Sequence, residues 1–69
     1  MKFTELELRA FGVLCRYRGR VLRGDVLAHK AGISDTSIAG IMRRLGYKLR
    51  HMGYWQLTHK GPGGGYSLT

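Results

Sequence analysis

The spacing of apolar residues predicts a helix near the start of the chain. Its apolar stripe consists of Leu8, Phe11, Leu14 and Cys15, widened by Ala10, Val13 and Tyr17. Thr4 and Glu7 match the capping box that begins many helices, and Phe3 and Leu8 stand where a hydrophobic staple would pack. We therefore expect a helix over about residues 5–18, closed by Gly19, with Cys15 in the core. Because Gly12 inside this helix costs about 1 kcal/mol relative to alanine, we also expect another element to pack closely against it.

A short second helix follows in the pattern. Val21 and Leu22 fit a minimal strand, and a helix is expected over about residues 24–31. Its inward-facing residues are Val26, Leu27 and Ala31. Gly32 is expected to end it.

The longest helical stripe predicts a third helix over about residues 35–52. Its core-facing positions are Ile38, Ile41, Met42, Leu45, Leu49 and Met52. Gly46 could end the helix early, but Leu49 and Met52 continue the same stripe. We therefore favour a helix that ends at Gly53.

Beyond Gly53 the apolar pattern alternates, which predicts a β-hairpin over residues 54–69. Trp55 and Leu57 share one side of its first strand, Tyr66 and Leu68 share one side of the second, and both aromatic rings are expected to contact the core. The intervening stretch HKGPGGG, residues 59–65, forms a long tip. Bare glycines there would let backbone N–H groups approach an anionic oxygen, Pro62 would restrict the tip, and Lys60, with His59 as a weaker candidate, would add charge.

The composition of the chain predicts a polyanionic partner. The chain has 69 residues, with 12 Lys and Arg against 4 Asp and Glu, for a formal net charge of +8. This length fits a single domain, residues 1–69, with a small core. No apolar run is long enough to span a membrane, and the start MKFTELEL turns acidic where a secretory signal would stay apolar. We expect a cytoplasmic protein, mature from Met1, without a membrane partner.

Several classes of chemistry are disfavoured. One cysteine excludes an internal disulfide and a multi-cysteine metal site, and the three histidines lack zinc-ligand spacing. The four carboxylates show no nucleophile and base beside them, so no enzyme activity, cofactor, metal or small-molecule ligand is expected. The glycine string does not fit a nucleotide-binding loop, because no helix follows it.

The stretch LAHKAGISDTSI, residues 27–38, resembles the turn region of helix-turn-helix DNA-binding proteins. Ala28 would let two helices approach, and Gly32 would make the turn without steric cost. Ile33 would fill the core beneath the turn, and Ser34 would cap the third helix. The final string GPGGGYSL, residues 61–68, resembles the wing of the iron–sulfur cluster regulator family of bacterial repressors.

These resemblances imply an α+β fold of the winged helix-turn-helix class, a three-helical DNA-binding bundle with a C-terminal β-hairpin wing. The wing would lie along the DNA backbone or enter the minor groove. The cluster-binding cysteines and long dimerisation helix of the repressor family have no counterpart in this sequence, so iron–sulfur sensing is not implied.

The face of the third helix opposite its apolar stripe is the candidate recognition face. Candidate base-reading residues are Thr36, Ser37, Gly40 and Arg43. Candidate phosphate-binding residues are Arg44, Tyr47, Arg50, Lys60, Gly61, Gly63 and Gly64. The alternatives are a solvated basic face and a tip that binds nothing.

The favoured function is sequence-specific binding of double-stranded DNA by a small prokaryotic or phage transcriptional regulator. If about five cations meet phosphate, the log–log salt slope of binding should be about −4 to −5. An alternative is an architectural accessory factor of a phage or mobile element, active in excision or packaging. A further alternative is a basic module that binds RNA or an acidic protein. We expect a homodimer on DNA or a larger protein partner, because half a recognition site rarely gives strong specificity.

Overall fold

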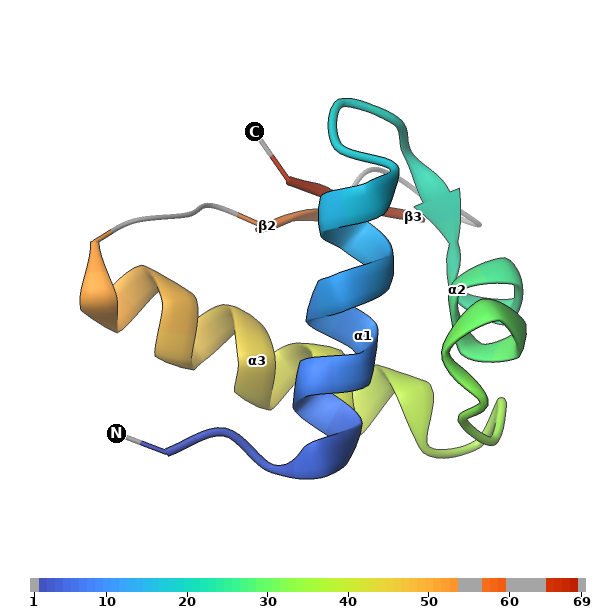
Figure 1. Ribbon diagram of the computed structural model, residues 1–69, viewed down its shortest axis with the longest axis horizontal. Coiled ribbons are helices and arrows are strands. Elements are labelled where there is room, and N and C mark those ends of the chain that lie inside the picture. Colours follow the sequence, from blue (N-terminus) through green and yellow to red (C-terminus); the bar gives the residue numbers. More distant parts are fainter. Residues whose placement is uncertain (1, 54–56, 60–64, 69) are drawn as a thin grey trace.

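Three helices pack around a small antiparallel sheet in the computed structural model, which describes residues 2–53, 57–59 and 65–68 (Figure 1). The elements are α1 (Glu5–Arg16), β1 (Leu22–Arg23), α2 (Gly24–Ala31), α3 (Ile38–Met52), β2 (Leu57–His59) and β3 (Gly65–Leu68). Helix α1 packs against both other helices and against β3. The α+β class predicted from the sequence is confirmed.

The predicted capping box begins α1. The Thr4 backbone N–H donates to Glu7 Oε1 at 2.9 Å, and the Glu7 N–H donates to Thr4 Oγ1 at 3.2 Å. The helix ends at Arg16 rather than Arg18, because Arg18 N–H bonds to Cys15 and Arg20 N–H bonds to Tyr17 in a tighter turn. Gly19 lies within this turn with φ of 86°.

The buried face of α1 differs from the predicted stripe. Ala10 and Leu14 are buried as expected, but Leu8 is 53% exposed and Cys15 is exposed, so both core predictions were wrong. Glu7 is fully buried as well, and its carboxylate has charged partners on α3. The buried face of α1 is thus centred on Glu7, Ala10 and Leu14, and Leu8 and Cys15 lie outside it.

The prediction of close packing at Gly12 was also wrong. A Cβ placed on Gly12 would meet nothing within 4 Å among the described residues, and the residue is exposed. Internal packing therefore does not explain this glycine.

Helix α2 and the turn after it follow the prediction. Gly32 adopts the left-handed conformation with φ of 69°, and the Ile33 N–H donates to the Ala28 carbonyl at 2.8 Å. Ala28 is fully buried and Ile33 is 8% exposed, as a tight helical corner requires. Val26 was expected to face inward but is 37% exposed, because Ala28 and Ala31 occupy the inner face beside Leu27.

Helix α3 begins later than predicted. The Ser34 carbonyl accepts from Ser37 N–H and Ile38 N–H, and the Ser34 hydroxyl accepts from Thr36 N–H at 3.2 Å. Residues 34–37 thus form a separate turn, and the N-cap residue is Ser37, without a side-chain cap. The predictions of a helix from residue 35 and of Ser34 as its cap were wrong, because the Ser34 hydroxyl is used within this turn.

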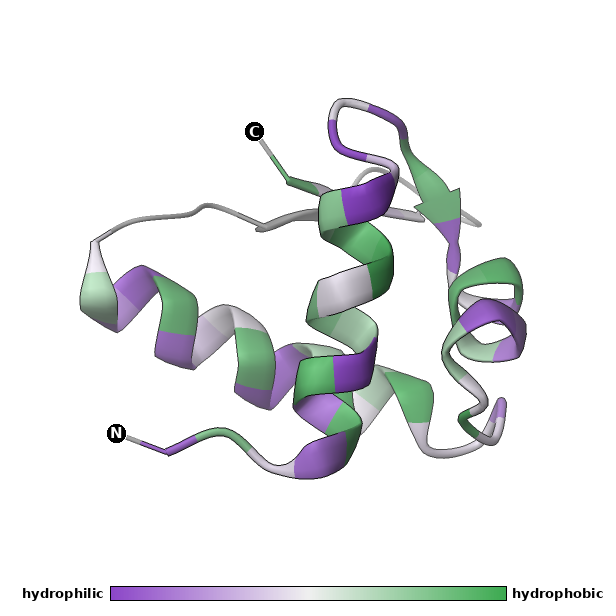
Figure 2. Ribbon diagram, viewed as in Figure 1, coloured by the Kyte–Doolittle hydropathy of each residue, from purple (hydrophilic) through white to green (hydrophobic). Residues whose placement is uncertain are grey.

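The longer alternative for the end of α3 is confirmed. The helix runs through Gly46 to Met52, and Gly53 closes it with φ of 75°. The predicted stripe is buried at Ile38, Ile41, Met42, Leu45 and Leu49. Met52, in the last turn, is 43% exposed and does not join the core. Figure 2 shows hydrophobic and hydrophilic residues alternating along this helix.

The sheet has strand order β1-β3-β2, with every neighbouring pair antiparallel. Leu22 pairs with Tyr66, and Leu57 pairs with Leu68. The minimal strand lies one residue later than expected, and β2 extends to His59 while β3 begins at Gly65. Of the aromatic residues predicted to contact the core, Tyr66 packs against it, whereas Trp55 lies outside the described residues.

The core lies between the three helices and β3. Its fully buried large side chains include Leu14, Leu27, Leu45, Leu49 and Leu68. None of the helices in the described part of the chain is long and apolar enough to cross a membrane.

Candidate nucleic-acid interface

Every candidate site residue that the structure describes is exposed. They are Thr36 and Ser37 in the turn before α3, and Gly40, Arg43, Arg44, Tyr47 and Arg50 within the helix. The remaining candidates, Lys60, Gly61, Gly63 and Gly64, lie outside the described residues. The candidate residues on α3 are exposed because the buried stripe from Ile38 to Leu49 faces the core and fixes the opposite side of the helix outward.

Arg43, Tyr47 and Arg50 share one side of α3 and line a shallow groove. Residues seven apart lie two turns along on nearly the same helix face, which aligns Arg43 with Arg50. The groove has a volume of about 550 Å³, and Tyr66 of β3 lies on its opposite wall. Within residues 2–53, 57–59 and 65–68, neither arginine makes an ion pair, so both guanidinium groups remain available to an external anion.

Tyr47 forms the aromatic part of this face. Its ring stacks on that of His51, with centroids 5.9 Å apart and an interplanar angle of 16°. The tyrosine is 63% exposed, so the pair presents a flat surface with a hydroxyl at its edge. Such a surface can pack on a sugar or a thymine methyl while the hydroxyl reaches a phosphate.

The hydroxyl residues before α3 are held by the turn that precedes the helix. Thr36 Oγ1 lies 2.8 Å from Ser34 Oγ, and its N–H donates to the same serine oxygen. This pair of bonds fixes Thr36 on an exposed turn. Ser37 makes no side-chain bond to the helix end, so its hydroxyl is not committed to capping.

Arg44 has a different environment from Arg43. Its Nε lies 3.6 Å from Glu7 Oε2, while 64% of its side chain remains exposed. The structure therefore separates two adjacent arginines that the sequence grouped together. Arg43 lines the groove, and Arg44 is drawn toward α1.

Lys48 is the charged residue of α3 that the sequence analysis missed. Its Nζ donates to Glu7 Oε1 at 2.5 Å and to the Lys2 carbonyl at 2.8 Å, and its side chain is only 18% exposed. Its position in the sequence could have indicated this role, because Lys48 adjoins Leu49 and lies three residues after Leu45, at the edge of the apolar stripe. A lysine so near the apolar stripe needs a buried partner.

The environment of Glu7 lowers the pKa of its carboxyl group. Burial alone would raise it, but the hydrogen bonds from Lys48 and the Thr4 amide and the charges of Lys48 and Arg44 together lower the pKa below its ordinary value. Glu7 is therefore ionised at neutral pH and neutralises positive charge on the inner side of α3. On the outer side, Arg43 and Arg50 have no such carboxylate partner among the residues that the structure describes.

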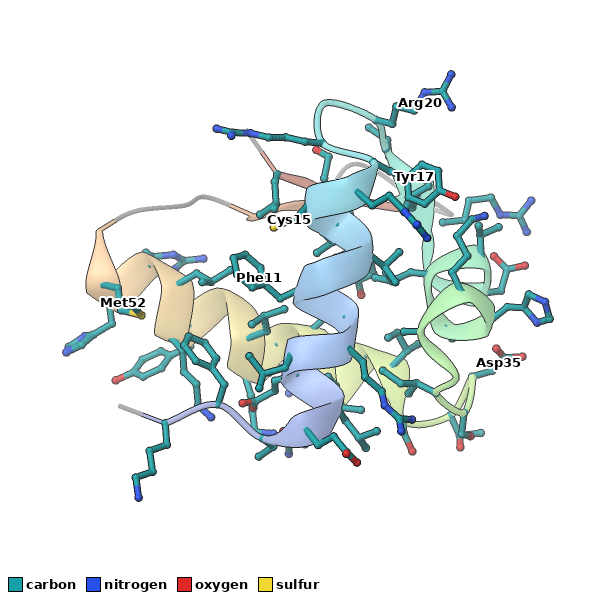
Figure 3. All side chains as sticks on the ribbon, viewed as in Figure 1. Phe11, Cys15, Tyr17, Arg20, Asp35 and Met52 are labelled. Atoms are coloured by element: carbon teal, nitrogen blue, oxygen red, sulfur yellow. The ribbon has the colours of Figure 1, made fainter. Side chains whose placement is uncertain are left out.

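The described residues do not form a metal-binding cluster. Among the described residues, no group of three or more His, Cys, Asp or Glu side chains could hold a metal ion. Arg20 lies in the turn after α1, away from α3 in Figure 3. It is an exposed arginine outside the groove.

Comparisons of the chain with protein-family models, with curated proteins and with solved structures found no match.

Proposed function

We propose that this chain is a winged helix-turn-helix domain that binds double-stranded DNA as a small prokaryotic or phage transcriptional regulator. The observation that carries the proposal is the groove on the outer side of α3, where Arg43 and Arg50 lie exposed beside Tyr47 and have no ion pair among the described residues. A net charge of +8 gives the whole molecule an attraction to polyanions.

The arrangement of elements supports the winged helix-turn-helix assignment. Helix α2, the turn at Gly32 and helix α3 form a helix-turn-helix unit, and the hairpin β2–β3 follows it along the chain. Strand β1 pairs with β3, which holds the hairpin beside the groove through Tyr66. Helix α3 and the hairpin can then approach one duplex together.

In this proposal α3 enters the major groove. The short residues Thr36, Ser37 and Gly40 lie near its N-terminal end, where they can approach base edges closely. Arg43 can donate two parallel hydrogen bonds to a guanine, and Arg50 and Tyr47 bind phosphates farther along. Lys60 and the glycines Gly61, Gly63 and Gly64 would contact the backbone from the wing.

The test is selection of bound duplexes from a random library, followed by affinity measurements on the selected sequence. Arg43→Ala should weaken binding by roughly tenfold, whereas Arg20→Ala, which removes the same charge outside the groove, should change it by less than about twofold. Equal losses of DNA affinity in both variants, or a selection that enriches no sequence, would indicate general charge attraction and contradict the proposal. A palindromic consensus would indicate binding by two copies.

A further inference from the structure

A second groove lies between α1 and α2, and none of its residues belongs to the α3 groove. Its volume is about 380 Å³. Part of its lining is apolar or lacks a side chain, from Leu8, Gly12, Val13 and Ala31. The rest is basic, from Arg9, Arg16 and Lys30.

The apolar part of this groove is more open than the fold requires. Leu8 is 53% exposed and presents apolar surface to solvent beside the half-buried Val13. Gly12 destabilises α1 by about 1 kcal/mol relative to alanine, yet a Cβ there would meet nothing within 4 Å among the described residues. An external side chain that packs over Gly12 and against Leu8 would account for both features.

The basic residues are held around this apolar surface. Lys30 Nζ of α2 donates to the Tyr17 hydroxyl at 3.3 Å and lies 4.7 Å from the centre of its ring. Arg9 pairs with exposed Glu5 at 3.8 Å, a surface contact that leaves its side chain 50% exposed. With Arg16, these residues give the groove a net positive charge.

We propose that the α1–α2 groove binds an amphipathic segment of a protein partner that carries acidic residues beside leucine-like side chains. The cations complement the acidic residues, and the apolar surface at Leu8 and Gly12 accepts the apolar side chains. A second copy of this chain fits poorly, because each copy has a formal net charge of +8. Bare phosphate would leave Leu8 and Val13 without an apolar contact.

The probe is a fluorescein-labelled synthetic helix of about four turns, or ~15 residues, with leucine on one face and glutamate on the other. The control probe is a scrambled peptide of the same composition. Binding to the full chain is followed by fluorescence anisotropy at physiological salt. The selected DNA duplex is titrated in parallel, so that loss of one activity can be told from loss of the other.

Two variants address the two parts of the groove. Gly12→Leu fills the apolar part and improves helix propensity, so the fold is retained. Arg16→Glu reverses one charge. Each should weaken the helical peptide by at least ~10-fold and leave the affinity for duplex DNA within ~2-fold. Arg20→Glu, the matched charge reversal outside the groove, should change peptide binding by less than ~2-fold.

Three results would overturn the proposal. The first is equal binding of the scrambled peptide, or an equal loss with Arg20→Glu, because either indicates general charge attraction. The second is a concentration-dependent dimer in sedimentation that Gly12→Leu dissociates, because it assigns the groove to a second copy. The third is displacement of the peptide by duplex DNA together with weaker DNA binding by Arg16→Glu, because it assigns the groove to nucleic acid.

Discussion

The Lys48 ammonium group donates to the Glu7 carboxylate at 2.5 Å, across 41 positions of the sequence. The contact joins the first turn of α1 to the second half of α3. Since Glu7 also closes the capping box with Thr4, one side chain both starts α1 and sets its position against the helix that carries the candidate interface.

Removing the charge of Glu7 should destabilise the fold strongly. Glu7→Gln leaves Lys48 mostly buried without a counter-charge, and breaking a buried pair in this way costs about 3–5 kcal/mol. The measurement is the free energy of unfolding in urea. Glu5→Gln is the matched control, because the Glu5 side chain is 80% exposed, and its effect should stay below about 1 kcal/mol. Similar losses in the two variants would show that the buried pair is not a main source of stability.

Stability should also fall in acid because of Glu7. Its pKa in the folded chain is below the ordinary value of 4.5, so its contribution is present above pH 4.5 and is lost as the pH falls through the folded pKa. Thermal unfolding between about pH 6 and pH 3 should show this loss in the native sequence. Glu7→Gln, although less stable at every pH, has no ionisable group at this position and should have a flatter profile. An unchanged profile would mean that other carboxylates cause the acid sensitivity.

The adjacent arginines of α3 should differ in their effect on DNA binding. Arg43→Ala removes a groove cation that has no ion pair within the described part of the chain, whereas Arg44→Ala removes one that is already close to Glu7. If Arg43 contacts a base or a phosphate, Arg43→Ala should bind DNA more weakly. If the contact is to a phosphate, the log–log salt slope of binding should also become less steep by about 0.9. We expect a smaller change for Arg44→Ala in the same titrations of affinity against salt. The reverse order would place the DNA on the α1 side of α3.

Gly65 should not tolerate alanine. A Cβ at this position would overlap the Leu22 carbonyl oxygen and lie 2.9 Å from the Arg23 nitrogen, where β3 pairs with β1. Because backbone atoms must move to accept it, Gly65→Ala should cost about 1–3 kcal/mol in thermal unfolding. An unchanged midpoint would show that the two strands separate at little cost.

The helices were predictable because their apolar spacing and end signals agreed. Gly32 and Gly53 both adopt the left-handed conformation at helix ends, and α2 has the predicted bounds. The start of α3 was not predictable from the capping serine, since Ser34 can cap either a helix or an isolated turn, and its hydroxyl bonds within the turn.

The outward side of α3 was predictable, but the pairing of its charges was not. The helical period predicted that Arg43, Tyr47 and Arg50 lie on one side of α3, and all three line the groove. No local pattern links Glu7 to Lys48, because that contact depends on how α1 crosses α3. The exposure of Leu8 and Cys15, at apolar positions in the sequence, was likewise not visible in the local pattern.

Gly12 and Gly40 form a matched pair that separates stability from DNA binding. Both are exposed, both lie inside helices, and a Cβ on either would meet nothing within 4 Å among the described residues. Alanine at each position should therefore stabilise the fold by about 0.8–1 kcal/mol, which raises the midpoint of thermal unfolding by roughly 4–8 °C for a domain of this size.

If α3 enters the major groove, Gly40→Ala should nevertheless weaken DNA binding, because the new methyl group lies on the side that approaches the bases. Gly12→Ala, on α1, should leave that affinity unchanged. Should Gly40→Ala stabilise the fold without any loss of DNA affinity, the start of α3 does not approach the duplex closely, and base reading would have to begin at Arg43.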